Sequence, residues 1–250
     1  MLKSERQELI LNRVEQYGKV VVNELTEELA VTEDTIRKDL QELSKAGLVR
    51  RVHGGAIRTD KSLKPFEQRI NQDSSRKQAI AKEAVQFLHP DQVIYIDSGT
   101  TNLSFSSEIP LSFKGTVVTN SPSIALNLSD HSELRIRLLP GELNKETKVI
   151  EGSDTISAIR NINFDLCILG VSSIDINKGI TVPMMEESLL KQQVIKQSSH
   201  VITIITADKI GSSSTYFVDE AKALDVLVTE KDIPDNLITP YQQEGIQVIY

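Results

Sequence analysis

From residue 92 onward, short apolar runs alternate with polar or helical segments, and this alternation constrains the fold more than any other feature of the chain. Each run is almost continuously apolar, which is typical of strands buried on both faces of a parallel sheet. The sequence therefore predicts an α/β domain, Rossmann-like, with helices on both sides of the sheet. The predicted strands are 92–97, 115–119, 134–139, 165–171, 200–206, 223–229 and 246–250.

Polar residues follow several predicted strands, at the carboxyl ends where such sheets gather ligands. The segment 97–101, Asp-Ser-Gly-Thr-Thr, follows the first strand and opens a helix, where free amides, hydroxyls and the helix dipole favour an anion. Asn120 and Ser121 follow the second strand, Gly141 the third and Ser172 the fourth. Ser98 and Ser121 have a simpler alternative role as helix caps. Together, these turns predict a single ligand site.

Charged residues later in the chain allow two interpretations. Glu187 and Lys191 lie at i,i+4 spacing on a predicted helix, so they are either site residues or a surface ion pair. Lys209 lies in a turn before Gly211, where it either reaches a phosphate or faces solvent. The single cysteine, Cys167, lies in an apolar run and is expected to be a buried thiol, which excludes an internal disulfide and a Cys-rich zinc site.

The first sixty residues carry a different pattern. Apolar residues at helical spacing predict three short helices. The third covers 32–45, with Thr32 as its N-cap and Ile36, Leu40 and Leu43 on its inner face. The stretch 48–58 predicts a β-hairpin, in which Gly54-Gly55 allows a tight turn or a close backbone approach. Three helices and a hairpin predict a winged helix-turn-helix domain.

The chain is acidic, with a formal net charge of -7, yet the first domain is suited to a polyanion. Ten basic and ten acidic residues balance over 1–58, and 43–59 holds four basic residues and no acidic one. Charges beyond about 10 Å are screened at ordinary salt, so the local placement of basic residues, and not the net charge of the chain, determines whether this domain attracts a polyanion. The competing interpretation is a solvated face, with Arg37 paired to Asp34 or Gln41. The predicted DNA contacts are Thr32, Thr35, Arg37, Lys38, Gln41, Arg50, Arg51, His53 and Gly54.

The composition, 39% hydrophobic and 25% charged, is that of an ordinary globular protein. No apolar run approaches the roughly 18 residues of a membrane span, and the charged start lacks the apolar core of a signal peptide. We therefore expect a cytoplasmic protein that does not interact with membranes. The expected domains are a winged helix-turn-helix over 1–57, a linker over 58–75 and an effector-sensing and oligomerisation domain over 76–250. No metal, cofactor or catalytic residue is predicted.

On these motifs, the chain resembles the DeoR family of bacterial transcription regulators. In the first domain the resemblance rests on Arg6 and on "VNELTEELAVTEDTIRKDLQELSKAGLVRRVHGGA", most specifically residues 32–40. In the second it rests on "DSGTT", "VVTNS", "FDLCILGVSSID", "GITVP" and "DKIG". The resemblance implies a DNA-binding regulator, usually a repressor of sugar-utilisation genes, with 32–45 as the recognition helix. It also implies a sensor domain similar in fold to ribose-5-phosphate isomerase and CoA-transferases, with a phosphorylated sugar as effector.

Departures from the family pattern fall near the implied effector site: Pro140-Gly141 replaces two glycines, Met184 replaces an acid, and Thr206 replaces an aspartate. Arg69 and Lys77 also fit the pattern, but solvated charges explain them and they are assigned no chemistry. The effector contacts that the resemblance implies are Asp97, Ser98, Gly99, Thr100, Thr101, Asn120, Ser121, Gly141, Ser172, Glu187, Lys191 and Lys209.

The expected partners are double-stranded operator DNA, a phosphorylated sugar and further copies of the chain. A homodimer or homotetramer is expected because paired half-sites on DNA require paired domains. Two alternatives remain open. One is a sugar-phosphate isomerase-like enzyme with Asp97, Glu187 and Lys191 as acid/base groups, and the other is a regulator whose sensor domain only oligomerises.

Overall fold

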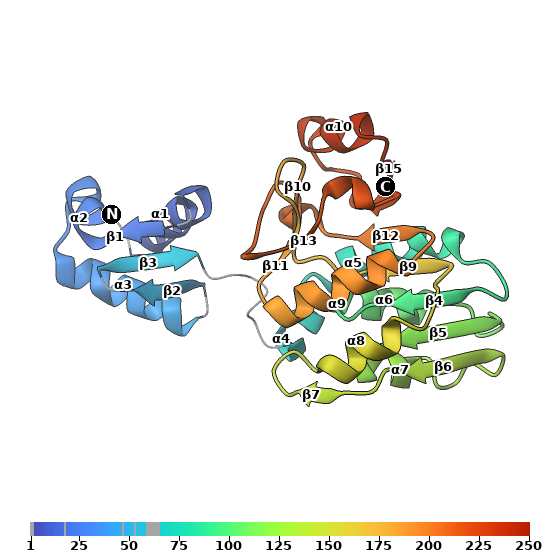
Figure 1. Ribbon diagram of the computed structural model, residues 1–250. Helices are drawn as coiled ribbons and strands as arrows, with labels where there is room; N and C mark the ends of the chain where they lie inside the picture. Colours follow the sequence, from blue (N-terminus) through green and yellow to red (C-terminus); the bar gives the residue numbers. More distant parts are fainter. Residues whose placement is uncertain (1–2, 18, 47, 53, 59–65) are drawn as a thin grey trace. The chain divides into compact units, whose positions relative to one another are not determined.

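A computed structural model describes residues 3–17, 19–46, 48–52, 54–58 and 66–250, and the chain divides into two compact units, Met1–Lys64 and Pro65–Tyr250 (Figure 1). Sequence analysis placed 58–75 in a linker. From Phe66 onward, however, this segment is helical and belongs to the second unit, because Phe66 is only 5% exposed and anchors it there.

The first unit is a three-helix fold with a small antiparallel sheet in the order β1-β3-β2. The predicted hairpin is present as β2 and β3, and the helix expected over 32–45 is present as α3. Strand β1 was not predicted, because a strand of three residues leaves almost no periodic signal. The elements are α1 (Lys3–Tyr17), β1 (Lys19–Val21), α2 (Val22–Leu29), α3 (Glu33–Lys45), β2 (Val49–Val52) and β3 (Gly55–Arg58).

The core of the first unit contains the apolar stripe predicted for the third helix. Ile36, Leu40 and Leu43 of α3 are buried against apolar residues of α1 and α2. Gly55 is needed where β3 approaches β1, because a Cβ atom there would lie 2.0 Å from the carbonyl oxygen of Val20. The close backbone approach expected at this glycine is therefore confirmed.

The second unit is built on a seven-stranded sheet in the order β15-β14-β12-β9-β4-β5-β6, and every neighbouring pair is parallel. All seven predicted strands are present in it. From β4, which lies next to the central strand β9, the chain first extends the sheet toward β6 and later toward β15, so the order switches direction between β4 and β9. The strands are β4 (Val93–Ile96), β5 (Gly115–Thr119), β6 (Leu134–Leu138), β9 (Leu166–Leu169), β12 (Val201–Ile204), β14 (Val226–Val228) and β15 (Gln247–Ile249).

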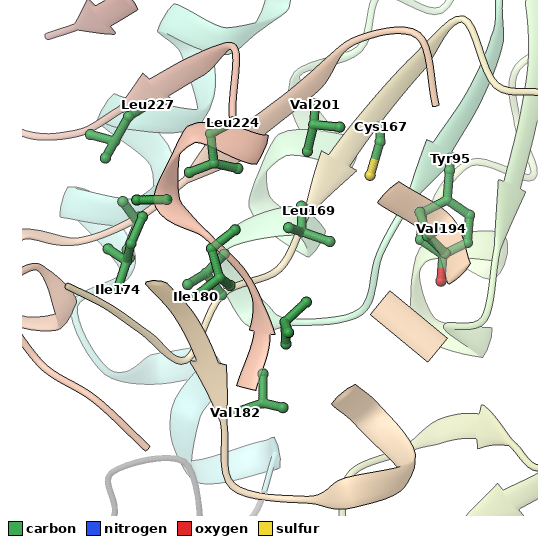
Figure 2. Packing of buried hydrophobic residues seen from close by; sticks show 14 of the residues in the cluster. Tyr95, Cys167, Leu169, Ile174, Ile180, Val182, Val194, Val201, Leu224 and Leu227 are labelled. Carbon is green, nitrogen blue, oxygen red and sulfur yellow. The ribbon is translucent and has the colours of Figure 1, made fainter. Parts of the chain in front are cut away.

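Helices cover both faces of this sheet, which explains why its inner strands are almost entirely apolar, whereas the edge strand β6 carries exposed arginines (Figure 1). In β4, Tyr95 faces one apolar cluster while Ile94 and Ile96 face another. Figure 2 shows part of the first cluster, to which Cys167 of β9 and Val194 of α9 both belong. Cys167 is buried as predicted, and burial raises the pKa of its thiol well above the ordinary value. The helices are α4 (Phe66–Asn71), α5 (Ser74–Ala84), α6 (Thr100–Glu108), α7 (Pro122–Asn127), α8 (Ser153–Ile159), α9 (Met185–Lys196) and α10 (Asp235–Gln243).

Two smaller sheets extend the second unit, and sequence analysis did not predict them. β7 (Glu142–Asn144) and β8 (Val149–Glu151) form a hairpin, and β10 (Ser173–Asp175), β11 (Gly179–Val182) and β13 (Tyr216–Asp219) form an antiparallel sheet. Among the described residues, no helix is both long enough and apolar enough to cross a membrane. The same part of the chain holds no group of three or more His, Cys, Asp or Glu side chains suited to a metal ion.

Candidate functional site

The turn between α2 and α3 directs the third helix. Ala30 ends α2 in the left-handed conformation, with φ 51°. The hydroxyl of Thr32 caps α3, because it accepts a hydrogen bond from the amide of Thr35 at 3.4 Å, and it also lies 2.9 Å from the Thr35 hydroxyl. Thr32 therefore has a structural role as well as its predicted place at the DNA surface.

The outer face of α3 carries the polar side chains expected to meet DNA. Lys38 and Gln41 are exposed, and Thr35 is half-buried. Arg37 pairs with Glu33 at 2.9 Å, rather than with Asp34 or Gln41 as the alternative interpretation supposed. An exposed pair of this kind contributes roughly 0–1 kcal/mol, so Arg37 can exchange it for a phosphate at little cost.

The hairpin formed by β2 and β3 supplies the wing. Arg51 and Gly54 are exposed, and Gly54 adopts φ 82° in the turn. Arg50 lies in β2, but its side chain is outside the described part of the structure, as is the whole of His53. The structure thus brings together the predicted helix and part of the predicted wing in one unit.

A partly buried ion pair holds α3 against α1. Arg6 donates from Nε to Asp39 Oδ2 at 2.5 Å and from a terminal nitrogen to Asp39 Oδ1 at 3.2 Å. Asp39 is only 2% exposed. Gln7 donates to Asp39 at 3.3 Å and to Glu42 at 2.9 Å. Asp39 therefore positions α3 and does not face DNA, although it lies in the motif that sequence analysis found most specific.

In the second unit, Asp97 joins three elements at the point where the strand order switches. Its carboxylate accepts hydrogen bonds from the amides of Ser98 at 2.8 Å and Gly170 at 2.9 Å, and it pairs with Lys191 of α9. Asp97 is 0% exposed. Its side chain is therefore fully engaged inside the protein and orients the loops that follow β4 and β9.

Lys191 is buried with two carboxylates around it. It is 1% exposed, and it pairs with Glu187 at 3.2 Å as well as with Asp97. Desolvation lowers the pKa of Lys191, but the two carboxylates outweigh that effect and raise the pKa above its ordinary value. The interpretation of Glu187 and Lys191 as a surface ion pair is therefore wrong, because Lys191 lies in the interior.

The loop from Ser98 to Thr101 leads from β4 into α6. Gly99 has φ 125°, a conformation that favours glycine, and Thr100 and Thr101 are buried. Asn102 donates to the carbonyl oxygens of Asp97 at 2.9 Å and Ile168 at 3.1 Å. These bonds fix the amide, and among the described residues its oxygen has no hydrogen-bond partner. A buried acceptor left in this way is suited to a ligand hydroxyl.

A second buried acceptor lies after β5. The side chain of Asn120 donates to the Ile150 carbonyl oxygen at 3.4 Å, and its own oxygen has no partner within the described structure. Ser121 caps α7 by accepting from the amide of Ile124 at 3.4 Å, so its capping role is sufficient to explain it. Gly141 has φ 141°, and a Cβ atom there would lie 2.3 Å from the Thr155 hydroxyl oxygen. Gly141 is thus required by packing.

Lys209 gathers with three other basic residues. It is half-buried, donates to the Val171 carbonyl oxygen at 3.1 Å, and lies beyond the carboxyl end of β12. Desolvation, opposed by Asp208 and reinforced by the nearby charges of Arg69, Lys77 and Lys191, lowers the pKa of Lys209 to about 8. We call these four basic residues, Arg69, Lys77, Lys191 and Lys209, the cation cluster. Asp97 and Glu187 already compensate Lys191, whereas at Lys209 and Lys77 desolvation outweighs the nearby carboxylates, and desolvated cations of that kind are suited to bind an anion.

Arg69 and Lys77 were assigned no chemistry from the sequence. The missed signal is the position of Lys77 on the inner face of α5, one turn from Ile80 and Ala81, since a lysine on an apolar stripe is rarely a solvated charge. Lys77 is 8% exposed, and desolvation lowers its pKa. Arg69 carried no comparable signal, because α4 is a short helix in what was expected to be a linker.

Comparisons with known proteins agree with this geometry. Residues 6–62 match the DeoR-like helix-turn-helix domain, and residues 72–231 match the DeoR C terminal sensor domain. The chain belongs to the DeoR family. The predicted family is thus confirmed, and with it a DNA-binding transcriptional regulator built from a helix-turn-helix domain and a sensor domain.

Two curated relatives match this DeoR-family chain along almost its whole length. It is 30% identical to the HTH-type transcriptional regulator GolR of Listeria innocua, covering 99% of this chain and 98% of that protein. It is 28% identical to the glycerol-3-phosphate regulon repressor of Escherichia coli, covering 99% of each. Among solved structures, ribose 5-phosphate isomerase A from Neisseria gonorrhoeae is 16% identical, with a TM-score of 0.41 over 55% of this chain and 54% of that one.

Proposed function

We propose that this DeoR-family regulator represses sugar-metabolism genes and that a phosphorylated sugar, bound at the carboxyl edge of the large sheet, controls its affinity for operator DNA. The observation that carries the proposal is the cation cluster around Lys209. The Escherichia coli relative is named as the repressor of the glycerol-3-phosphate regulon, and glycerol 3-phosphate is a small phosphorylated polyol. A ligand of that class carries a phosphate, which suits the cation cluster. It also carries hydroxyl groups that can donate hydrogen bonds to the side-chain oxygens of Asn102 and Asn120.

On the first unit, α3 is the element that enters the major groove of operator DNA. Thr35, Lys38 and Gln41 are placed to meet base edges, and Arg37 to meet a phosphate or a guanine. The wing holds the flanking backbone through exposed Arg51 and the turn at Gly54. The full set that we assign to DNA is Thr32, Thr35, Arg37, Lys38, Gln41, Arg50, Arg51, His53 and Gly54.

On the second unit, the phosphate lies at the cation cluster and the sugar hydroxyls face Asn102 and Asn120. The loop 98–101 and Ser172 supply further donors, whereas Asp97, Glu187 and Lys191 hold that loop in place. Ser121 and Gly141 shape the neighbouring turns. The full set that we assign to the effector site is Asp97, Ser98, Gly99, Thr100, Thr101, Asn120, Ser121, Gly141, Ser172, Glu187, Lys191 and Lys209, with Asn102 added.

Enzymatic use of the same residues is chemically unfavourable. A general base needs a free lone pair and a pKa near the working pH. Asp97 accepts from two amides and from Lys191, and the raised pKa of Lys191 keeps that amine protonated. Isomerisation of a pentose or hexose phosphate by the pure protein, abolished in Lys191→Met, would overturn this conclusion.

The test is fluorescence anisotropy of labelled DNA from immediately upstream of the gene, titrated with the full chain at near-physiological salt. We expect specific binding that one sugar phosphate shifts by about 5-fold or more, since a ligand shifts the equilibrium only by its difference in affinity for the two states. The matching unphosphorylated sugar is the control. Specific binding that no phosphate shifts would contradict gating, and equal affinity for random DNA would contradict the regulator.

Assembly is tested separately. We propose a homodimer or homotetramer, because two DNA-binding domains are needed to occupy paired half-sites. Sedimentation equilibrium on the full chain measures this directly. A monomer at the concentration that saturates the DNA would refute the assembly without affecting the DNA contacts of α3.

A further inference from the structure

Helix α4 lies against the candidate effector site, and it is the first described element after the DNA-binding unit. Phe66 begins α4 and is buried in the second unit. The guanidinium carbon of Arg69 lies 5.7 Å from the centre of the Phe66 ring, a cation–π distance. Helix α4 also contacts α6, whose N-terminal end is the loop 98–101. Helix α4 is thus packed against the helix that this loop opens.

Polar contacts join α4 to two further elements around the site. The ammonium group of Lys77 in α5 donates to the carbonyl oxygens of Arg69 at 2.5 Å and Gln72 at 2.6 Å, where α4 ends. Glu67 of α4 lies 4.0 Å from Lys148 in the turn between β7 and β8. Lys77 therefore has two tasks, since it belongs to the cation cluster and also holds the last turn of α4.

The charges around α4 favour a bound anion. Arg69, Lys77 and Lys209 repel one another, while Glu187, Asp73 and Asp208 offset part of this positive charge. Desolvation lowers the pKa of Arg69 and of Lys77, because burial disfavours the charged form and the nearby carboxylates offset only part of that effect. A phosphate dianion would remove this repulsion and would attract both α4 and α5. The free energy of anion binding thus depends on where α4 sits.

We propose that Arg69 contacts the phosphate of the effector and that α4 is the element through which the bound phosphate acts on the DNA-binding unit. The proposal rests on the function proposed above. In the chain, residues 59–65 connect β3 of the wing directly to α4. Because α4 is the first described helix after this connection, a ligand whose affinity depends on the position of α4 can in this way be coupled to DNA affinity.

The chain allows a direct readout of α4, because it contains no tryptophan. In the full-length variant Phe66→Trp, the only indole would lie at the start of α4, within cation–π distance of Arg69. The probes are glucose 6-phosphate, glycerol 3-phosphate and inorganic phosphate, with glucose and glycerol as uncharged controls. Each is titrated into Phe66→Trp, Phe66→Trp/Arg69→Gln and Phe66→Trp/Arg135→Gln. Arg135 is a matched control, because it is exposed near the amino end of β6, away from the carboxyl edge.

We expect the phosphorylated probe that acts on the wild-type protein to change the indole emission, and Arg69→Gln to weaken its binding by about 10-fold or more, the usual loss for a hydrogen bond between two charged groups. Arg135→Gln should leave the binding unchanged. In the DNA anisotropy assay, Arg69→Gln should keep its affinity for DNA without ligand while the ligand no longer shifts it. Hydrogen exchange of residues 66–73 in the wild-type protein should slow on ligand binding, which checks α4 without any substitution.

The outcomes separate this inference from the proposed function. If the wild-type protein responds to a sugar phosphate and Arg69→Gln behaves like Arg135→Gln, the role of Arg69 is refuted and the gated regulator stands. If ligand binds normally but the exchange of residues 66–73 is unchanged, transmission through α4 is refuted. If no phosphorylated probe shifts wild-type DNA binding, gating itself fails and this inference fails with it.

Discussion

The lowered pKa of Lys209 predicts a pH dependence of effector binding that can be worked out in advance. In the free protein the pKa is about 8, because the amine is desolvated and faces Arg69, Lys77 and Lys191, with Asp208 opposing them. A bound phosphate dianion compensates those charges, so the pKa in the complex should return toward the ordinary lysine value of about 10.4. The protonated amine of Lys209 binds the anion. Above the pKa that Lys209 has in the ligand-free protein, effector binding must therefore be accompanied by uptake of a proton.

The size of the effect follows from these two pKa values. Between about pH 7 and about pH 9, the fraction of free protein with protonated Lys209 falls about 10-fold, while in the complex the amine stays protonated. Effector affinity should therefore fall about 10-fold over that range, or about 1.4 kcal/mol. A phosphate ester has a second pKa of about 6, so the charge of the ligand barely changes over this range and does not contribute to the change in affinity.

Isothermal titration calorimetry of the wild-type protein with its active sugar phosphate, at about pH 7 and about pH 9, measures this directly. Lys209→Arg is the matched variant, because a guanidinium keeps its charge over the range, and its affinity should change less than about 2-fold. Calorimetry in buffers of different ionisation enthalpy should also show uptake of a proton at about pH 9. A wild-type affinity that is flat with pH, or a slope that persists in Lys209→Arg, would refute the reasoning.

Three further perturbations have predicted sizes. Lys191→Met leaves Asp97 buried without its cation and should destabilise the protein by about 3–5 kcal/mol in urea unfolding; an unchanged midpoint would contradict the buried pair. Arg51→Gln should lower the slope of log DNA affinity against log salt concentration by about 0.9, because it removes one phosphate contact; an unchanged slope would exclude that contact. Gly55→Ala should lower the thermal midpoint of the first unit more than Gly54→Ala, because the Gly55 methyl would meet the carbonyl oxygen of Val20 whereas Gly54→Ala adds only the strain of alanine at φ 82°; equal shifts would count against that close approach.

Much of the fold could be predicted from local sequence patterns. The continuous apolar runs predicted all seven strands of the large sheet, because burial on both faces requires apolar residues at successive positions. The cap at Thr32 and the stripe of Ile36 and Leu40 predicted α3, because helix periodicity is local. The short strand β1 was not predicted, because its conformation depends on pairing with β3 and its three residues carry almost no periodic pattern of their own.

The candidate site was only partly predictable. Sequence analysis proposed the loop 98–101 from its position after a strand, left Lys191 and Lys209 open between site residues and surface charges, and treated Arg69 and Lys77 as solvated charges. The structure buries Lys191 against Asp97, a residue 94 positions away, and brings Arg69 and Lys77 close enough to Lys209 to lower its pKa. By itself, the sequence determined which segments become helices and strands, since periodicity and capping act over a few residues. Only the tertiary structure decided which charges meet, because burial and the distances between charges depend on how the whole chain packs.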